Sequence, residues 1–262
     1  MLGEGIYPYF ITTRNGARCS SSVAFLAAAK KRANLEVMTG TRVTELVTKS
    51  GCAVAVAAVQ NGQSQIFSAR GEIILAAGAI GSPHILQLSG IGPGALSQLH
   101  GIDVTYDQPN VGKHMQDHLG INYFHKANRP TLNNVLGSWP HLMLAGLNYI
   151  MRRKGPLSLG VNQLGGLVRA TPDAPRLDTQ LYINPITYRV TEPRRRRLTK
   201  PDKEAGFIFS FNACRPHSTG SVSIKSPDPM DAPNISGNYL DDPRDLGDVL
   251  RMARFIGRMQ HS

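Results

Sequence analysis

The strongest structural signal in this sequence is Glu72-Ile-Ile-Leu-Ala-Ala-Gly-Ala-Ile-Gly-Ser-Pro83. Its apolar run, residues 72–77, has the pattern of a β-strand that is covered on both faces, as in parallel sheets. The glycines that follow predict a turn, after which Ser82 is expected to cap a helix with Pro83 at its first position. Such a strand–turn–helix junction exposes backbone N–H groups and suits a phosphate, although the same unit recurs without a ligand on unrelated folds.

Short strands and helices are predicted on both sides of this junction. Strands are expected over residues 35–38, 42–48, 53–59, 65–69, 103–106, 165–169, 178–183, 206–211 and 221–225, and helices over residues 22–32, 84–89, 95–100 and 140–153 and from residue 242 onward. The last helix is expected to bury one apolar face, made of Leu246, Val249, Leu250, Ala253 and Ile256.

Length and composition indicate a globular protein. The chain has 262 residues, 41% of them hydrophobic, which is enough for one large domain or two small ones. The most apolar run, residues 73–80, is too short to span a bilayer, and the first residues carry no secretory signal pattern. Cys19, Cys52 and Cys214 are far apart, which predicts reduced thiols, no metal site and a cytoplasmic location, with membrane association left as an alternative.

The net charge of +11 invites a nucleic-acid interpretation. Much of the excess comes from one run, however, in which Arg189, Arg194–Arg197 and Lys200 outweigh Glu192. Two prolines flank the run and no aromatic residue interrupts it, which is typical of a solvated loop. We therefore expect no nucleic-acid partner, and an anionic partner or a membrane surface remains the alternative for this run.

Longer matches then point to a family. The residues from Gly78 to Pro93 resemble the second signature of the glucose–methanol–choline (GMC) oxidoreductases. Further matches follow in the family's order. Residues 16–26 resemble its G-x-R-x-S…AFL segment, residues 34–43 its N-L-x-V-x-T strand pair, and residues 110–119 its V-G-x-N-L-Q-D-H-L motif, with His114 in place of the usual Asn. Residues 155–158 resemble its G-P-L-S, and residues 218–240 its S-x-G-x-V…S-x-D-P…N-Y-L stretch. Together these matches cover nearly the whole chain.

The resemblance implies an α/β (α+β) fold and a flavin-dependent function. Residues 1–122 would form part of an FAD-binding Rossmann-like domain, and residues 123–262 a β-sheet substrate-binding domain backed by helices. The family, which includes choline dehydrogenase-like alcohol dehydrogenases, would use FAD to oxidise the CH–OH group of a primary alcohol. The partner expected from this resemblance is a small-molecule alcohol.

The resemblance also implies particular cofactor contacts. The family's valine in the second strand of its strand pair contacts the flavin adenine through its backbone, and Val43 matches it here. Without the family, Val43 would be read as an ordinary β-branched strand residue. The turn after residue 77 would lie close to the dinucleotide, where small residues allow backbone contact. The predicted cofactor-binding residues are Val43, Ala77, Gly78, Ser82 and Pro83.

Three further positions follow from the resemblance. Asp117 and His118 would lie near the junction of the two domains, and we expect them to hold that junction together by hydrogen bonds. Gln163 falls where choline-handling relatives often carry a carboxylate. A neutral amide holds a quaternary ammonium group less well than a charge does, which argues against choline as the substrate.

Two elements of the family's chemistry are not found in this sequence. Residues 3–8 lack the third glycine and the preceding strand of a G-x-G-x-x-G fingerprint, and residues 90–94 have the wrong spacing. None of the eight histidines has the family's catalytic context, and His84 is expected to have a structural or surface role. We therefore assign no catalytic residue and expect an incomplete enzyme that is inactive alone. The alternatives are a truncated, non-catalytic interaction module with an Arg-rich loop, or the product of a broken gene.

Overall fold

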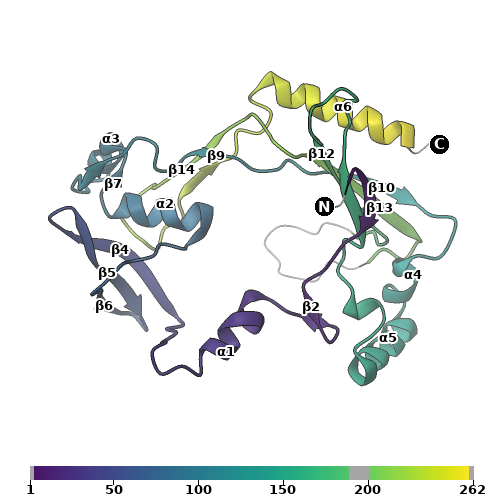
Figure 1. Cartoon of the computed structure of the whole chain (residues 1–262), viewed down its shortest axis with the longest axis horizontal. Helices are drawn as coiled ribbons and strands as arrows, with labels where there is room; N and C mark the ends of the chain where they lie inside the picture. Colours follow the sequence, from purple (N-terminus) through teal and green to yellow (C-terminus); the bar gives the residue numbers. More distant parts are fainter. Residues whose placement is uncertain (1–2, 189–200, 260–262) are drawn as a thin grey trace. The chain divides into compact units, whose positions relative to one another are not determined.

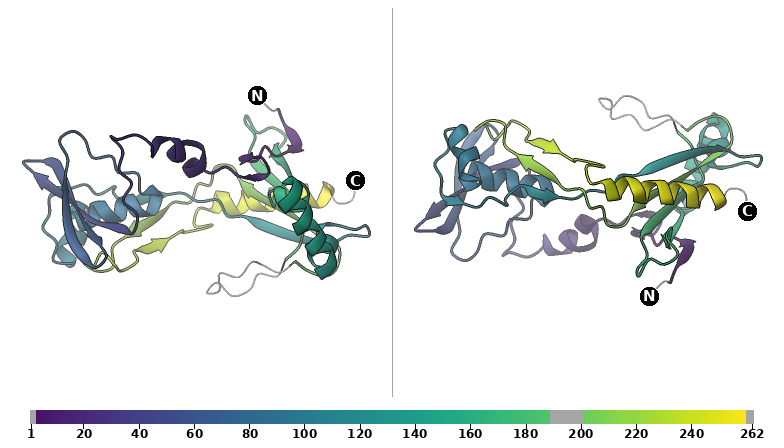
Figure 2. Two further views of the ribbon diagram at one scale, coloured as in Figure 1. Left: turned by 90° about the horizontal axis from the view of Figure 1, so that it is seen from below. Right: turned by 90° about the horizontal axis from the view of Figure 1, so that it is seen from above.

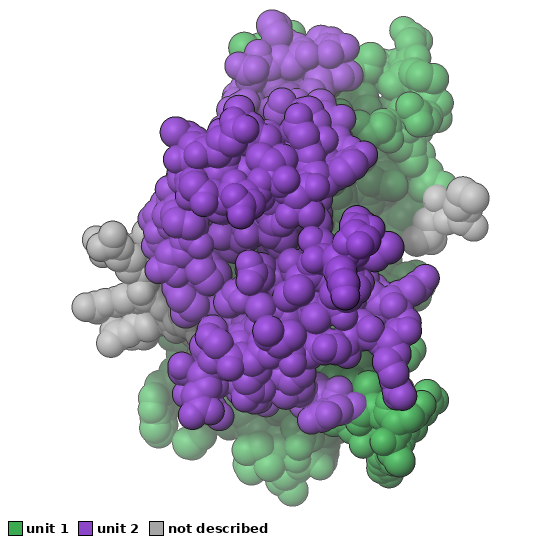
Figure 3. Space-filling view, turned by 90° about the vertical axis from the view of Figure 1, so that its left-hand side faces the viewer, with its two compact units in different colours: residues 1–35, 118–215, 246–262 green, residues 36–117, 216–245 purple. Residues whose placement is uncertain are grey.

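The computed structural model describes residues 3–188 and 201–259 of the chain (Figure 1). It forms two compact units whose segments alternate along the sequence (Figure 3). Unit 1 comprises Met1–Leu35, His118–Arg215 and Leu246–Ser262, and unit 2 comprises Glu36–Asp117 and Pro216–Asp245. The division into compact units does not test the boundary expected at residue 122 between an FAD-binding and a substrate-binding domain, so that boundary stays a prediction. The arginine-rich run at 189–200 lies outside the described residues.

Unit 1 is built on a five-stranded antiparallel sheet in the order β1-β11-β12-β13-β10. Leu181 lies near its centre, paired with Gly166 on one side and with Phe211 on the other. The strands are β1 (Gly5–Pro8), β10 (Ile121–Lys126), β11 (Leu164–Val168), β12 (Thr179–Asn184) and β13 (Gly206–Ala213), and β2 (Thr13–Arg14) pairs separately with β3 (Ala17–Arg18). Strands β11 to β13 were predicted, whereas β1 and β10 were not.

Helix α6 (Pro243–Met259) supplies the core on one face of this sheet (Figure 1). Side chains alternate between faces along a strand, so Leu181, Phe209 and Phe211 point to the same side, where they pack against Met252 and Ile256. Full burial of one such side chain stabilises the fold by about 1.5–3 kcal/mol. The predicted apolar face of this helix is correct in part, because Val249, Ala253 and Ile256 pack on the core whereas Leu246 and Leu250 are about half exposed.

The remaining helices of unit 1 are short except for one. The predicted helix at 22–32 is present as the π-helical turn η1 (Ser22–Leu26) followed by α1 (Ala27–Ala29). The predicted helix at 140–153 is confirmed as α5 (Trp139–Arg152), which follows α4 (Leu132–Leu136) and precedes the 3₁₀ turn η2 (Pro156–Ser158). Among the described residues no helix combines the length and the apolarity needed to cross a bilayer.

Unit 2 contains a β-meander and a helix that packs beside it (Figure 2). Strands β4 (Thr41–Lys49), β5 (Cys52–Gln60) and β6 (Gln63–Ser68) confirm three predicted strands, and Asn61-Gly62 forms the predicted tight turn with both residues at positive φ. The Leu46 N–H donates to Ser89 Oγ at 2.8 Å, which ties β4 to the end of α2 (Gly78–Leu88).

Two small sheets complete unit 2. Strand β14 (Gly220–Ser223) pairs with β9 (Lys113–Met115) and with β15 (Asn234–Ser236). The parallel pair β7 (Ile91–Gly92) and β8 (Tyr106–Asp107) flanks α3 (Gly94–Leu99). The strand predicted over residues 103–106 is thus reduced to a two-residue pairing that begins at Tyr106.

Three sequence predictions around the central junction are wrong. Residues 72–77 form no strand in the described part of the chain, and Ile74 is 84% exposed rather than buried. Residues 35–38 likewise form no strand. Helix α2 begins at Gly78, so its N-cap is Ala77, and Ser82 and Pro83 lie inside the helix instead of starting it. At the sixth helical position, Pro83 has no N–H to donate, so the helix lacks one backbone hydrogen bond there.

Candidate functional site

A buried amide on helix α2 links it to two other segments of unit 2. The Gln87 side chain donates from Nε2 to the carbonyl oxygens of Val111 (3.1 Å) and Val222 (3.0 Å). Its Oε1 accepts from the backbone N–H of Ile224 at 2.9 Å. All three contacts are to main-chain groups that need partners when buried, so this amide fixes the helix against β14.

The N-terminal end of α2 is open to solvent and free of side-chain caps. Gly78, Ala79 and Ile80 are exposed, and no acidic residue lies in the first turn. Gly78 has a φ of 79°, and a Cβ added there would meet no atom within 4 Å. The first-turn N–H groups of a helix carry a partial positive charge. With small residues around them, they suit an anionic group such as a dinucleotide phosphate.

Of the five predicted cofactor residues, four belong to this helix and one to the neighbouring strand. Ala77 and Gly78 are exposed at its start, whereas Ser82 and Pro83 are partly buried within it. Val43 lies on β4 opposite Ala58, next to an irregularity in the strand pairing between Val43 and Glu45. A β-bulge of this kind interrupts the ladder and redirects the local backbone. Strand β4 packs against α2, so these residues share one region of unit 2.

His84 is buried on the same helix. Burial lowers the pKa of its imidazole below the usual 6.5, and the nearby Arg42 charge lowers that pKa further. The neutral ring is therefore favoured in the folded chain. This agrees with the structural role expected from the sequence.

Unit 1 presents a different kind of surface on the sheet face opposite α6. Side chains alternate between the two faces of β12. One face carries Thr179, Leu181 and Ile183 and packs on the core. The other face is polar or amphipathic and carries Gln180, Tyr182 and Asn184. On β13, Ser210 and Asn212 continue this polar face. The strand was predicted from the sequence but its polar face was not, although the alternation in Thr179–Asn184 is the signal for it.

Two amide groups on this face are buried without partners. Among the described residues no hydrogen bond is made by Gln163 Nε2 or by Asn184 Oδ1. Leu164 pairs with Ile183, so the same antiparallel register, continued by one residue, would bring Gln163 opposite Asn184. Unpaired buried polar atoms are costly, and a hydroxyl group, which both donates and accepts, can satisfy either an unused donor or an unused acceptor.

Two tyrosines border these amides. The Tyr9 hydroxyl donates to the carbonyl of Leu181 at 3.0 Å, and the Tyr9 and Tyr182 rings lie 5.9 Å apart. The ring of Tyr9 covers Gly165, where an added Cβ would come within 2.4 Å of it. Burial, followed by the influence of Tyr9 and Cys214, raises the pKa of Tyr182. Its phenol therefore stays protonated and able to donate a hydrogen bond.

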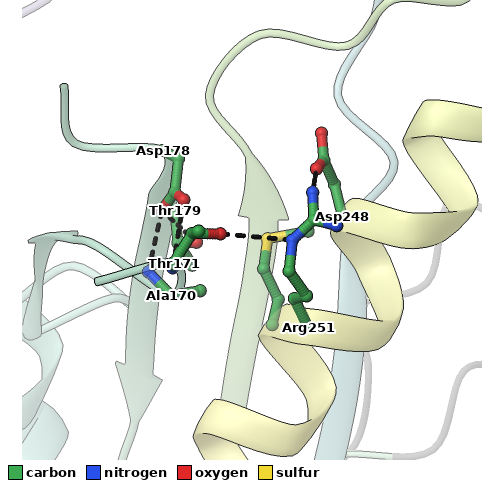
Figure 4. A pocket seen from close by; sticks show the side chains of 7 residues that line it. Ala170, Thr171, Asp178, Thr179, Asp248 and Arg251 are labelled. Carbon is green, nitrogen blue, oxygen red and sulfur yellow. Dashed lines mark hydrogen bonds and ion pairs between the residues drawn. The ribbon is translucent and has the colours of Figure 1, made fainter. Parts of the chain in front are cut away.

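A small hollow between β12 and α6 is lined by polar groups that are hydrogen-bonded or ion-paired (Figure 4). Asp178 accepts from the backbone N–H groups of Ala170 (2.8 Å) and Thr171 (3.3 Å). Arg251 donates from Nε to Thr171 Oγ1 at 3.1 Å and pairs with Asp248. Because these polar groups already have hydrogen-bond partners, we interpret the hollow as a structural link between α6 and the loop that joins β11 to β12.

Asp117 and His118 lie where the chain passes from one unit to the other. Asp117 accepts a hydrogen bond from the Tyr239 hydroxyl within unit 2, and His118 Nε2 lies 3.2 Å from the Cys214 carbonyl oxygen within unit 1. Each bond named here stays inside one unit. The predicted role of this pair in holding a junction together therefore stays a prediction.

Comparison with known proteins gives consistent similarities. Residues 2–120 match the family model for GMC oxidoreductases. The chain is 36% identical to an alcohol dehydrogenase (acceptor) of Pseudomonas putida over 97% of its own length and 46% of the relative's. It is 33% identical to an oxygen-dependent choline dehydrogenase of Vibrio vulnificus over 97% of its own length and 45% of the relative's. The chain thus spans about half the length of these curated relatives.

Solved structures show the same fold. A pyridoxine 4-oxidase from Mesorbium loti superposes with a TM-score of 0.76 at 25% identity, covering 97% of this chain and 46% of that one. A formate oxidase of Aspergillus oryzae gives a TM-score of 0.84 at 22% identity, covering 98% of this chain and 48% of that one. The mixed α/β class predicted from the sequence is confirmed by these neighbours.

Proposed function

Because the chain belongs to the GMC oxidoreductase family, we propose that it forms part of an FAD-dependent enzyme that oxidises the CH–OH group of a primary alcohol. FAD is the cofactor of the family. In this proposal residues 1–122 contribute to the FAD-binding domain and residues 123–262 to the substrate-binding domain. The observation that carries it is the start of α2, which is uncapped, exposed and without an acidic residue in its first turn.

The residues of unit 2 fit the dinucleotide part of FAD. The exposed N–H groups at Gly78 and Ala79 would hold a phosphate, and the backbone of Val43 beside the bulge would position the adenine. Ala77 keeps the approach to the helix free of bulky side chains. Ser82 and Pro83 lie one turn further in, so their contribution would be to shape this first turn.

The residues of unit 1 fit the alcohol. When bound, the flavin accepts the hydride that leaves the alcohol carbon. Gln163 and Asn184 offer an unused donor and an unused acceptor, which would orient a hydroxyl group on the sheet face opposite α6. Their neutrality favours an uncharged alcohol over a quaternary ammonium alcohol such as choline. None of the described histidines is assigned the role of base.

The first experiment is to sequence the coding DNA on both sides of this reading frame. We expect a G-x-G-x-x-G segment upstream and a segment with a catalytic histidine downstream, in frame or one frameshift away. The protein produced with those segments should bind FAD and show alcohol-dependent dye reduction. If neither segment is found, this chain acts as a separate product, and the interaction-module alternative replaces the enzyme proposal.

A matched pair of variants then tests the phosphate site in that longer protein. Ala79→Asp places a carboxylate in the exposed first turn of α2, and Ala95→Asp does the same at the exposed second residue of α3. Acidic residues suit a helix start, so neither change should unfold the chain. We expect FAD affinity to fall at least about tenfold in the first variant, from charge repulsion, and to be unchanged in the second.

A further inference from the structure

The outward face of helix α5 is apolar. Six of its side chains are each more than half exposed, at 54% to 74%: Trp139, Met143, Leu144, Leu147, Ile150 and Met151. Figure 1 shows α5 beside α4 at the outside of unit 1. A surface helix normally turns its apolar stripe toward the core. Here the buried residue is Ala145, and the larger apolar residues point away from the unit.

The six residues form one continuous surface. At 3.6 residues per turn, Trp139, Met143 and Ile150 fall along one line of the helix, and the other three widen the apolar surface to about 140° of the helix circumference. Ala145 and Tyr149 lie on the opposite side, toward the rest of unit 1. An exposed apolar patch of this continuity marks an interaction surface rather than scattered surface leucines.

The stretch of sequence that contains α5 carries positive charges and no acidic residue. No aspartate or glutamate occurs between His118 and Pro172. Arg152, Arg153 and Lys154 follow one another at the C-terminal end of α5, and Arg129 precedes α4. Within the described part of the chain none of these four cations forms a salt bridge with a carboxylate; Arg153 lies 5.0 Å over the Tyr149 ring instead.

We propose that α5 docks in the plane of an anionic lipid surface. Its apolar face would enter the boundary between headgroups and acyl chains, and Arg152, Arg153 and Lys154 would contact the headgroups. The helix has 14 residues, about 21 Å in length, which is too short to span a bilayer and suits a position along its surface. Trp139, at the first position of the helix, is a residue type that prefers this depth. This inference goes beyond the proposed function, because it requires neither flavin nor alcohol.

The position of Trp139 makes the test direct, because it is the sole tryptophan of the sequence. The chain is titrated with vesicles of phosphatidylcholine, and separately with vesicles of equal parts phosphatidylcholine and phosphatidylglycerol, while tryptophan emission and vesicle flotation are followed. We expect a blue shift and flotation with the anionic vesicles, both weakened by added salt. The absence of a shift and of flotation with anionic vesicles would overturn the proposal.

Matched variants separate α5 from general charge attraction. The triple variant Arg152→Gln/Arg153→Gln/Lys154→Gln should weaken anionic-vesicle binding about 100-fold, at about 1 kcal/mol for each cation. The control Lys30→Gln/Lys31→Gln/Arg32→Gln removes three consecutive exposed cations after α1, and it should change binding far less. Equal losses in the two triples would show nonspecific attraction and overturn the assignment to α5.

A second pair of variants tests the apolar face. Met143→Asp/Ile150→Asp should abolish the blue shift, whereas Ile66→Asp/Ile74→Asp, which alters two exposed isoleucines of unit 2, should leave it intact. Far-UV circular dichroism confirms that each variant is folded. A blue shift that grows with protein concentration in the absence of lipid, together with a larger mass in sedimentation, would instead assign this face to a second copy of the chain.

Discussion

The side-chain amide of Gln87 donates a hydrogen bond to the main-chain carbonyl of Val222, 135 residues further along the chain. The same amide bonds to Val111 and accepts from Ile224. One side chain thus satisfies three main-chain groups from two distant segments of unit 2. Together with the bond from Leu46 to Ser89, this contact positions α2, and with it the candidate phosphate site at its start.

Replacing this amide should therefore destabilise unit 2. Gln87→Leu leaves two carbonyl oxygens and one N–H group without their partner, and we expect a loss of about 3 kcal/mol or more in the free energy of unfolding. Gln98→Leu, at an exposed position on α3, is the control and should change that free energy by less than about 0.5 kcal/mol. Urea denaturation measures both values, and equal values for the two variants would contradict the role of Gln87.

Gly112 approaches the same cluster so closely that no side chain fits there. It has a φ of 84°, and an added Cβ would lie 2.1 Å from the Val222 carbonyl oxygen and 2.4 Å from Gln87 Nε2. Gly40→Ala is a matched control, since Gly40 has a φ of 67° with no atom within 4 Å of the added Cβ. The control should cost about 1–2 kcal/mol of backbone strain.

We expect Gly112→Ala to cost at least about 2 kcal/mol more than that control, because steric overlap is added to the strain. The difference between the two variants in thermal or urea unfolding isolates the overlap. A cost equal to that of Gly40→Ala would mean that the backbone of Gly112 can move away from Val222.

Replacing Asn184 is expected to increase stability while weakening the use of the alcohol. Its Oδ1 is buried without a partner in the part of the chain that the structure describes, and the residue is 5% exposed. Asn184→Leu should therefore raise the free energy of unfolding by about 1 kcal/mol. In the protein extended by its flanking segments, the same change should raise the KM for the alcohol. Asn212→Leu is the comparison, because Asn212 is 3% exposed but donates to the Ala213 carbonyl at 3.0 Å.

The Asn212 variant should therefore lose stability by about 1 kcal/mol or more. The two asparagines lie on the same sheet face. A gain of stability in the Asn184 variant and a loss in the Asn212 variant would therefore reflect the difference in hydrogen bonding. A loss of stability in both variants would show that Asn184 has a partner in solution.

The buried His84 predicts an acid-sensitive unit 2. Its folded pKa lies below the value of 6.5 expected in the unfolded chain, so the unfolded state binds more protons as the pH falls. The stability is complete above pH 6.5 and decreases as the pH falls below that value and approaches the folded pKa. His84→Gln should flatten this part of the stability–pH curve measured by urea denaturation between pH 7.5 and pH 5. An unchanged slope in the variant would assign the acid sensitivity to other groups.

Features set by local chemistry were predictable from the order of residues. The Asn61-Gly62 turn follows from the preference for positive φ in two-residue hairpin turns, and α5 follows from its apolar spacing and its basic end. The GMC resemblance was likewise readable, because its motifs are short, ordered and contiguous. These signals act within one or two turns of the chain, so no tertiary information was needed.

Features that require a distant partner were not predictable. Residues 72–77 have the composition of a buried strand, yet a strand exists only where another strand pairs with it, and none does among the described residues. β1 was missed for the reverse reason, because Gly5–Pro8 is strand only through its pairing with β11. The unpartnered amide atoms of Gln163 and Asn184 depend on how the strands of the sheet pack. The outward face of α5 depends on which side of the helix packs on the rest of unit 1. Periodicity along the chain shows that a helix or strand has two different faces, and packing between distant segments selects which face is buried.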